Sequence, residues 1–282
     1  MSQVVIDLLN KGAEASASDL YRHGNLVRLP GQGSIIITGD IHGHRRNLER
    51  VISYANLDEN PDRHVVLQEI IHGGETDRHG GCLSFEILFE AVSFKVRYPD
   101  QVHIIMGNHD TAFMTESEVM KDGREMNYLM RTAMKKRYGD LMQKTDLAIR
   151  RYLFSQPLAV KCDNGIWISH SLPDNRTIKA FNPEVFETEL RMDDIARGGA
   201  AHSLLWGRNQ SHAAVDAMAQ LVGATVFVTG HQPQECGWNL MHPNMLILSS
   251  EHNHGVLLCA DLGRSYTGRE LSEMVMPLAA IA

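Results

Sequence analysis

The chain has 282 residues, of which 43% are apolar and 22% charged, a composition typical of a globular protein with a sizeable buried core. Its formal net charge of −7 argues against a general polyanion binder, so no nucleic-acid partner is expected, although a local positive pocket is compatible with that sum. The four cysteines are far apart, which argues against a disulfide framework or a zinc knuckle. No stretch has the length of a membrane span or the layout of a signal peptide. We therefore expect a cytoplasmic protein without a membrane partner, and the oligomeric state stays open.

Hydrophobic periodicity predicts alternating helices and strands in the first part of the chain. The predicted elements are helices at 4–9 and 18–23, a strand at 34–38, a helix at 45–55, a strand at 64–68, a helix at 83–98 and a strand at 102–106. A Gly-rich segment at 73–81 separates the second strand from the helix that follows. The last five elements form a β-α-β-α-β series, which indicates an α/β fold.

The second part of the chain begins with a segment rich in Met, Lys, Arg and Leu that carries no β run, which predicts a helical insert at 111–156. The elements predicted after it are strands at 158–161, 165–169, 225–228, 245–249 and 255–261, with one helix at 213–221. There is no internal repeat or Pro-rich linker. We therefore expect a single domain over 1–282, with residues 1–33 as an N-terminal helical extension.

Four of the predicted strands end in side chains that bind metals. These side chains are Asp40 and His42 after the first strand, Asn108 after the third, and His170 and His231 after two later ones. Taken alone, such a histidine is more often a buried, hydrogen-bonded residue, and a Gly-Asn-His-Asp segment is also a common turn. Because an α/β sheet presents ligands at the carboxyl ends of its strands, the four ends together predict one metal centre.

The mixture of ligand types predicts the chemistry of this centre. Hydrolysis of a phosphate monoester at neutral pH needs a hydroxide-like nucleophile and neutralised phosphoryl charge, which two metal ions about 3.5 to 4 Å apart supply. Imidazole, carboxylate and amide ligands favour two divalent or trivalent ions of manganese, with iron or zinc as alternatives. His109 follows the ligand Asn108, in a position to protonate the leaving alkoxide. The sequence thus predicts a metal-dependent phosphoester hydrolase.

These segments resemble the calcineurin-like metallophosphoesterases, and more narrowly the branch of the serine/threonine phosphoprotein phosphatases and the symmetrical diadenosine tetraphosphate hydrolases. The similar segments are 39–43 for the first family motif, 107–110 for the third, 170–174 for the His-Gly-Gly-Leu-Ser-Pro element, 230–232 for the last histidine, and 135–160 and 204–206 for the protein phosphatases alone. The resemblance implies a four-layer sandwich of two mixed β-sheets flanked by helices. It also implies hydrolysis by a hydroxide bridging two metal ions, without a phosphoenzyme.

The second family motif, Gly-Asp-x-x-Asp-Arg-Gly, is absent in its usual form, and residues 68–74 read Gln-Glu-Ile-Ile-His-Gly-Gly in its place. By the resemblance, Glu69 would bridge the metals and His72 would replace the acid that supports the catalytic His109. Asp110, the next residue of the third motif, is grouped with these two histidines as catalytic. The alternative bridging ligand is Asp77 in the Gly-rich segment. Glu69 is favoured because it follows a strand directly.

Arginine binds phosphate through paired hydrogen bonds, and the candidates for substrate binding are Arg78 and Arg208. His252 and His254 are expected to lie in a loop near the site rather than to bind metal. The predicted function is a serine/threonine protein phosphatase-like phosphomonoesterase acting on a phosphorylated protein or a small phosphoester. The alternatives are a symmetrical dinucleoside tetraphosphate hydrolase and, because of the altered second motif, a non-catalytic binder of phosphorylated ligands.

Overall fold

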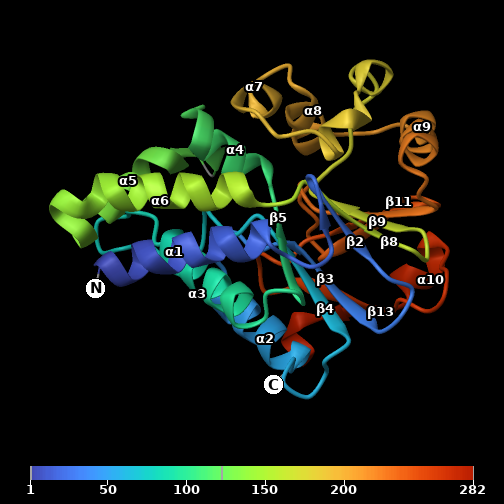
Figure 1. Ribbon diagram of the computed structural model, residues 1–282, viewed down its shortest axis with the longest axis horizontal. Helices are drawn as coiled ribbons and strands as arrows, with labels where there is room; N and C mark the ends of the chain where they lie inside the picture. The colour runs from blue at the N-terminus through green and yellow to red at the C-terminus, as the bar shows by residue number, and fades with distance from the viewer. Residues whose placement is uncertain (1, 122, 282) are drawn as a thin grey trace.

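The computed structural model describes residues 2–121 and 123–281, which form two large β-sheets with helices on their outer sides (Figure 1). The α-helices are α1 Ser2–Ala17, α2 Arg45–Ala55, α3 Ser84–Arg97, α4 Asn108–Thr115, α5 Met126–Tyr138, α6 Met142–Ser155, α7 Met192–Ile195, α8 Ala200–Trp206, α9 His212–Val222 and α10 Gly268–Ser272. The strands are β1 Arg22–His23, β2 Leu26–Leu29, β3 Ser34–Asp40, β4 Arg63–Gln68, β5 Val102–Ile105, β6 Met120–Lys121, β7 Arg124–Glu125, β8 Ala159–Cys162, β9 Ile166–Ser169, β10 Val226–Thr229, β11 Trp238–His242, β12 Met245–Leu248, β13 Val256–Asp261 and β14 Val275–Pro277. Short 3₁₀ turns are η1 Gly139–Leu141, η2 Ile178–Ala180, η3 Pro183–Phe186 and η4 Leu278–Ala280.

Both large sheets are mixed. The five-stranded sheet has the order β14-β13-β3-β4-β5. In it β3, β4 and β5 run parallel, and β13 runs antiparallel to both of its neighbours, β3 and β14. The seven-stranded sheet has the order β1-β2-β8-β9-β10-β12-β11, with β9, β10 and β12 parallel. Parallel neighbours place their carboxyl ends on one edge, which is where open α/β sheets bind ligands.

The two sheets pack face to face, because alternate residues of each strand point to opposite sides. Ile35 and Ile37 of β3 pack in one core cluster with Val228 of β10 and Leu246 of β12, between the sheets. Ile36 belongs to the other cluster, which contains the buried residues of the covering helices. This sequence of helix, sheet, sheet and helix confirms the predicted four-layer sandwich.

The sheets meet at the carboxyl end of β3. Asp40 forms a parallel bridge with Ser249, directly after β12. A Cβ on Gly39 would lie 2.1 Å from the carbonyl oxygen of Leu248, so only glycine permits this approach. The ligand-bearing ends of the two sheets are therefore joined at one place.

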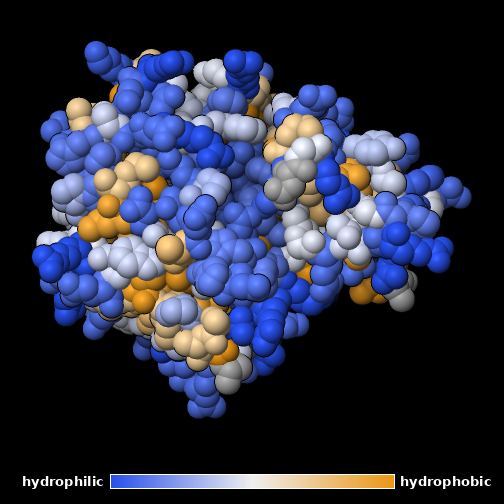
Figure 2. All heavy atoms as spheres, turned by 180° about the vertical axis from the view of Figure 1, so that it is seen from behind, coloured by the Kyte–Doolittle hydropathy of each residue, from blue (hydrophilic) through white to orange (hydrophobic). Residues whose placement is uncertain are grey.

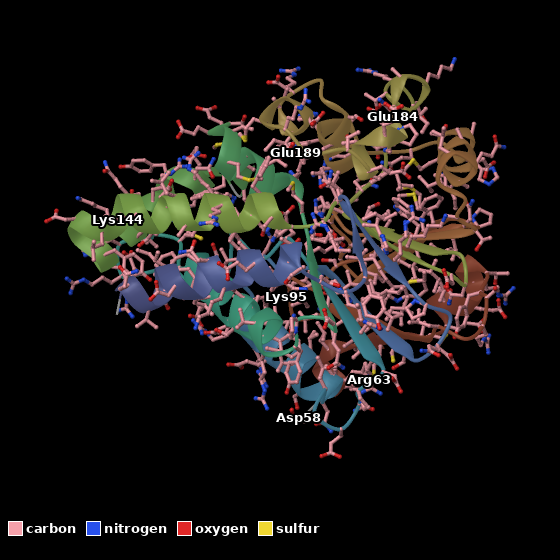
Figure 3. All side chains as sticks on the ribbon, in the orientation of Figure 1. Asp58, Arg63, Lys95, Lys144, Glu184 and Glu189 are labelled. Carbon is pink, nitrogen blue, oxygen red and sulfur yellow. The ribbon has the colours of Figure 1, made fainter. Side chains whose placement is uncertain are left out.

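The helix predicted at 18–23 is wrong, because β1 occupies 22–23 and pairs with β2. The carboxylate of Asp19 accepts a hydrogen bond from the N–H of Tyr21 at 3.0 Å, a local turn that competes with helix. The same carboxylate accepts a bond at 2.8 Å from Lys95 on α3, which is labelled in Figure 3. Gly24, with φ of 60°, completes the hairpin. The N-terminal extension therefore contains strands as well as the long helix α1.

The segment 111–156 contains most of α4, the helices α5 and α6, and a small β6–β7 hairpin that the sequence did not predict. The other unpredicted elements are β2, β11, β14, α7, α8 and α10. Most of these have five residues or fewer, too short for a hydrophobic period to be detected.

The surface seen from behind in Figure 2 is mainly hydrophilic, with hydrophobic side chains gathered toward its lower left. Among residues 2–121 and 123–281, no helix combines the length and apolarity that crossing a bilayer requires.

Candidate metal centre

The six predicted ligands come together at the junction of the sheets. They are Asp40 at the end of β3, His42 two residues later, Glu69 after β4, Asn108 after β5, His170 after β9 and His231 after β10. Each of these side chains is buried, with at most 7% of the residue exposed. Polar groups buried this deeply need partners, and here the partners are other ligands, backbone groups and Gln68.

The Nε2 atom of His170 is the meeting point of one group of donor atoms. It lies 2.9 Å from Oε2 of Glu69, 2.8 Å from Oδ1 of Asn108 and 3.1 Å from Nδ1 of His231. The last two atoms are themselves 2.9 Å apart. Neighbouring ligands of an octahedral ion with bonds of about 2.1 Å are about 3 Å apart, so these donors have the spacing of a metal shell.

A second group of donors lies beside the first. Oδ2 of Asp40 is 3.9 Å from Nε2 of His42, and Oδ1 of Asp40 is 3.6 Å from Nδ1 of His170. In the described ranges, no three His, Cys, Asp or Glu side chains already surround an ion-sized space.

Hydrogen bonds around the centre select the ring nitrogens that face it. Nδ1 of His42 is 2.8 Å from the carbonyl oxygen of Ile71, which can only accept, so Nδ1 carries the proton and Nε2 has the free lone pair. Nδ1 of His170 is 2.9 Å from Oε1 of Gln68, whose amide nitrogen donates to the carbonyl of Thr38 at 2.8 Å. Metal-binding histidines have this kind of outer partner.

Burial determines the protonation states of the centre. It raises the pKa of Glu69 to about 8, against the N–H of His109 that donates to this carboxylate at 3.1 Å. Burial also raises the pKa of Asp40 to about 6 and lowers that of His170 to about 4. Neutral imidazoles beside buried carboxylates favour a bound cation, because the cation stabilises the ionised acids.

Four residues of the site have left-handed backbone conformations. Their φ angles are 42° for His42, 49° for Glu69, 67° for His72 and 66° for His231. This conformation costs a residue other than glycine about 1 kcal/mol or more, and such strain is concentrated at functional sites. The turns after β3, β4 and β10 thus direct these side chains toward the site, and their strained backbone lowers the stability of the fold.

Two glycines make room for the carboxylates. A Cβ on Gly107 would lie 2.5 Å from the carboxylate of Glu69, and one on Gly230 would lie 2.1 Å from that of Asp40. Any other residue would displace a candidate ligand. The glycines of the Gly-Asn-His-Asp and Gly-His-Gln segments are therefore part of the centre.

His109 and His72 lie beside the centre and contact each other. Their Nδ1 atoms are 3.2 Å apart, so one ring donates and the other accepts. The rings of His109 and His42 are 4.7 Å apart. Burial lowers the pKa of His72 to about 3 and that of His109 well below its usual value. The two histidines that were predicted to act as a pair thus lie within hydrogen-bonding distance of each other.

Asp110 has a different environment. One of its carboxylate oxygens accepts a hydrogen bond from the N–H of Gly107 at 2.9 Å, which closes the first turn of α4. It thereby orients Asn108 and His109, which begin that helix. The geometry thus gives Asp110 a helix-capping role, and its predicted catalytic role stays a prediction.

Of the three other predicted residues, only Arg208 contacts the metal centre. The carboxylate of Asp77 accepts hydrogen bonds from its own loop and one from Lys136 at 3.0 Å, apart from the six ligands. Arg78 is exposed and bonds to the neighbouring His79. Arg208 contacts the centre from a partly exposed position: it donates to the carbonyl of His231 at 2.9 Å, and the charges of Asp40 and Glu69 only partly offset the desolvation that lowers its pKa.

Sequence reasoning missed three residues of the site. Gln68 orients His170, and its position directly before Glu69 at a buried strand end was an available signal. Lys121 of β6 pairs with the carboxylate of Glu251 beside the centre. No motif marks these last two, which are 130 residues apart in the chain.

Curated phosphatases resemble this chain over most of its length. A probable serine/threonine-protein phosphatase of Encephalitozoon cuniculi is 23% identical over 260 residues, which cover 86% of this chain and 51% of the relative. A serine/threonine-protein phosphatase of Caenorhabditis elegans is 24% identical over 230 residues, which cover 76% and 46%. The chain thus spans about half the length of these relatives.

Solved structures share the fold. A serine/threonine phosphatase from Saccharomyces cerevisiae with similarity to human phosphatase PP5 superimposes with a TM-score of 0.72 at 14% identity, over 99% of this chain and 93% of its own. A cold-active protein-tyrosine phosphatase from Shewanella gives 0.58 at 18% identity, over 89% and 82%. The calcineurin-like phosphoesterase family matches residues 33–262. The chain therefore belongs to the calcineurin-like phosphoesterases, a family of metal-dependent hydrolases.

Proposed function

We propose that the protein is a serine/threonine phosphatase-like phosphomonoesterase that uses two metal ions. The observation that carries this proposal is the convergence of three ligand atoms on Nε2 of His170, so that four atoms from four different strand ends meet. The names of the curated relatives support the substrate class. The preferred metal is manganese, because the donors mix imidazole, carboxylate and amide.

We assign the six ligands to two ions. Asp40 and His42 would hold one ion, and Asn108, His170 and His231 the other. Glu69 fits the bridging position better than Asp77, because its buried carboxylate lies among the other ligands whereas that of Asp77 bonds to a surface loop. When bound, the two ions supply a nucleophile at neutral pH and neutralise charge on the phosphoryl oxygens.

The chain's own residues orient the substrate and move one proton. Arg208 would bind a phosphoryl oxygen through its guanidinium fork. A bound phosphate dianion favours the protonated form of the nearby His109, against the effect of burial. Protonated His109 would donate from Nδ1 to Nδ1 of His72, which leaves its Nε2–H for the leaving oxygen.

The test is inorganic phosphate release from a phosphothreonine peptide by manganese-loaded protein, with a chelator-treated control. We expect release that is lost with the metal and restored by adding it back. A phosphotyrosine peptide is the matched substrate, because one structural relative is named a protein-tyrosine phosphatase. Release that persists after complete removal of metal would contradict the proposal.

Diadenosine tetraphosphate tests the second candidate, a symmetrical dinucleoside tetraphosphate hydrolase. The observation that favours it is a pocket of about 540 Å³ beside His42, whose wall includes the apolar side chains of Met126 and Leu129. Rapid formation of adenosine diphosphate, without phosphate release from peptides, would select it. A third reading, a non-catalytic binder of phosphorylated ligands, would require folded, metal-loaded protein that hydrolyses neither substrate.

A further inference from the structure

The pocket beside the candidate metal centre is open on one side and carries charge on its rim. Its volume is about 540 Å³, and its lining includes His42, Lys121, Arg124, Glu251, Met126 and Leu129. This size is within the range of small-molecule sites, which combine an apolar wall with a few polar groups. Because His42 is a predicted ligand, a substrate in this pocket would reach the centre.

The side chain of Lys121, on the β6–β7 hairpin, lines this pocket. Its ammonium group contacts the carboxylate of Glu251, which follows β12 on the other side, and the two side chains are 25% and 18% exposed. Burial, and next the charge of Lys121, lower the pKa of His42 and of His72. Lys121 is therefore a fixed positive charge close to both the ligands and the catalytic pair.

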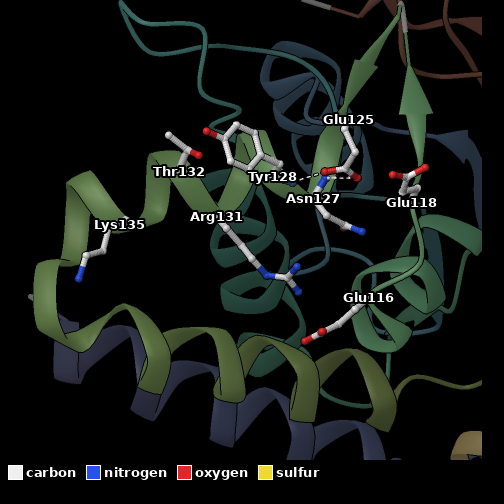
Figure 4. A pocket seen from close by; sticks show the side chains of 8 residues that line it. All are labelled: Glu116, Glu118, Glu125, Asn127, Tyr128, Arg131, Thr132 and Lys135. Atoms are coloured by element: carbon white, nitrogen blue, oxygen red, sulfur yellow. Dashed lines mark hydrogen bonds between the residues drawn. The ribbon is translucent and has the colours of Figure 1, made fainter.

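The base of the hairpin is fastened to the helical insert. The carboxylate of Glu125 accepts a hydrogen bond from the N–H of Asn127 at 3.1 Å, at the start of α5 (Figure 4). The N–H of Met126 donates to the carbonyl of Val119 at 3.0 Å. The base of the hairpin that carries Lys121 is thus held in place.

Only one of the two predicted phosphate-binding arginines contacts the centre. The Asp-Arg-Gly arginine of the second motif is absent, and Arg78 lies in an exposed loop. Arg208 contacts the centre from the side of His231. A phosphate dianion gains from charge-assisted hydrogen bonds on more than one side.

We propose that Lys121 binds the phosphoryl group of the substrate in place of the missing arginine, and that Glu251 is the counter-ion it leaves when phosphate enters. This inference rests on the proposed function and adds a residue to it. A dianion competes well with a single carboxylate for an ammonium group, because the Coulomb attraction scales with charge. Glu251 also repels the entering phosphate, so the two residues have opposite effects on binding.

The experiment measures binding of inorganic phosphate to manganese-loaded protein by calorimetry, and KM for p-nitrophenyl phosphate. Lys121→Met should weaken phosphate binding and raise KM about 10-fold, the effect of one lost charge-assisted bond. Lys121→Arg should stay near wild type because it keeps the charge. Glu251→Gln should tighten binding about 3-fold. The matched control is Lys136→Met, which breaks a surface pair with Asp77, and it should change neither quantity.

The outcomes separate this inference from the proposed function. Equal phosphate binding by Lys121→Met and Lys136→Met overturns the inference, and continued metal-dependent hydrolysis then leaves the proposed function standing. A wild type that binds phosphate through Lys121 yet hydrolyses no phosphoester supports the inference and overturns the function. Weaker binding by Glu251→Gln would contradict the counter-ion role. Metal content and melting temperature, measured for each variant, identify one that has lost its ions or its fold.

Discussion

Two buried polar clusters lie at opposite ends of the parallel strands β4 and β5. At the amino ends, the carboxylate of Asp19 accepts bonds from Lys95 at 2.8 Å and from His103 at 2.9 Å, and His103 contacts His64 at 3.1 Å. At the carboxyl ends lie the six residues of the candidate metal centre. Both clusters combine carboxylates with imidazoles in a water-excluded place.

The clusters differ in where their positive charge comes from. Burial would raise the pKa of Asp19, but bonds from His103 and Lys95 reverse this and hold the pKa far below its usual value. Burial raises the pKa of Glu69 to about 8, because the N–H of His109 and the charge of Lys121 offset the desolvation only in part. A buried acid hydrogen-bonded to its own lysine is a structural element, whereas one whose nearest partners are imidazoles and backbone N–H groups is suited to binding a metal ion. The two clusters thus differ in whether a lysine is hydrogen-bonded to the buried carboxylate.

The largest expected effect comes from removing the negative charge of Glu69. Glu69→Gln should reduce turnover on the order of 10³-fold or more, the scale of losing one group that stabilises developing charge. It should also leave fewer than two ions per chain, measured by mass spectrometry. Asp77→Asn is the matched control, because that carboxylate bonds to a surface loop, and it should keep both ions. The reverse result would make Asp77 the bridging ligand.

Breaking the internal pair should cost stability instead of activity. Lys95→Met leaves Asp19 buried without its ammonium partner, which should lower the free energy of unfolding by about 3 to 5 kcal/mol. Urea unfolding measures this, and Lys144→Met on the exposed face of α6 is the control, expected to change it by less than about 0.5 kcal/mol (Figure 3). If Lys144→Met lowered the free energy of unfolding as much as Lys95→Met, the loss of the ion pair would not be the cause of the destabilisation.

Metal removal should affect only the carboxyl-end cluster. Manganese at about 100 times its dissociation constant should stabilise the protein by about 2.7 kcal/mol, since ions bind the folded state. The shift in melting temperature on chelation measures this. Glu69→Gln should lose most of the shift, whereas Lys95→Met should keep it on a lower baseline. An unchanged melting temperature in wild type on chelation would argue against a bound metal.

The residues that orient the ligands should have intermediate effects. Gln68→Leu removes the acceptor for Nδ1–H of His170, so metal affinity should fall about 10- to 100-fold. Metal-binding calorimetry is the measurement. Gln101→Leu is a suitable control, because its amide bonds to backbone near the amino end of β4, and it should leave metal affinity unchanged. Equal losses from both variants would indicate a general loss of packing.

The sequence predicted the carboxyl-end cluster and not the other one, for a physical reason. Each predicted ligand directly follows an apolar run, so local periodicity places it at a strand end. Asp19, Lys95 and His103 are brought together only by the fold, across separations of 76 and 84 residues. Lys95 occurs on a helix where a lysine is usually solvated, and no local signal separates it from Lys144. The pair of Lys121 and Glu251 went undetected for the same reason.

The pH dependence of stability sharpens the comparison further. Burial and the neighbouring His103 lower the pKa of His64 to about 3 in the folded protein, against 6.5 as the ordinary value. Below about pH 6.5 the unfolded chain therefore binds a proton at His64, whereas the folded chain does not bind it until near pH 3. The contribution of neutral His64 to the free energy of unfolding is thus fully present above about pH 6.5 and is lost as the pH falls toward 3. One such proton gives a slope of at most about 1.4 kcal/mol per pH unit. His64→Gln should flatten the slope of chelated protein by this amount between pH 6 and 4, measured by urea unfolding. An unchanged slope would place the acid sensitivity elsewhere, with His103 as the next variant to measure, because its pKa is also lowered by burial.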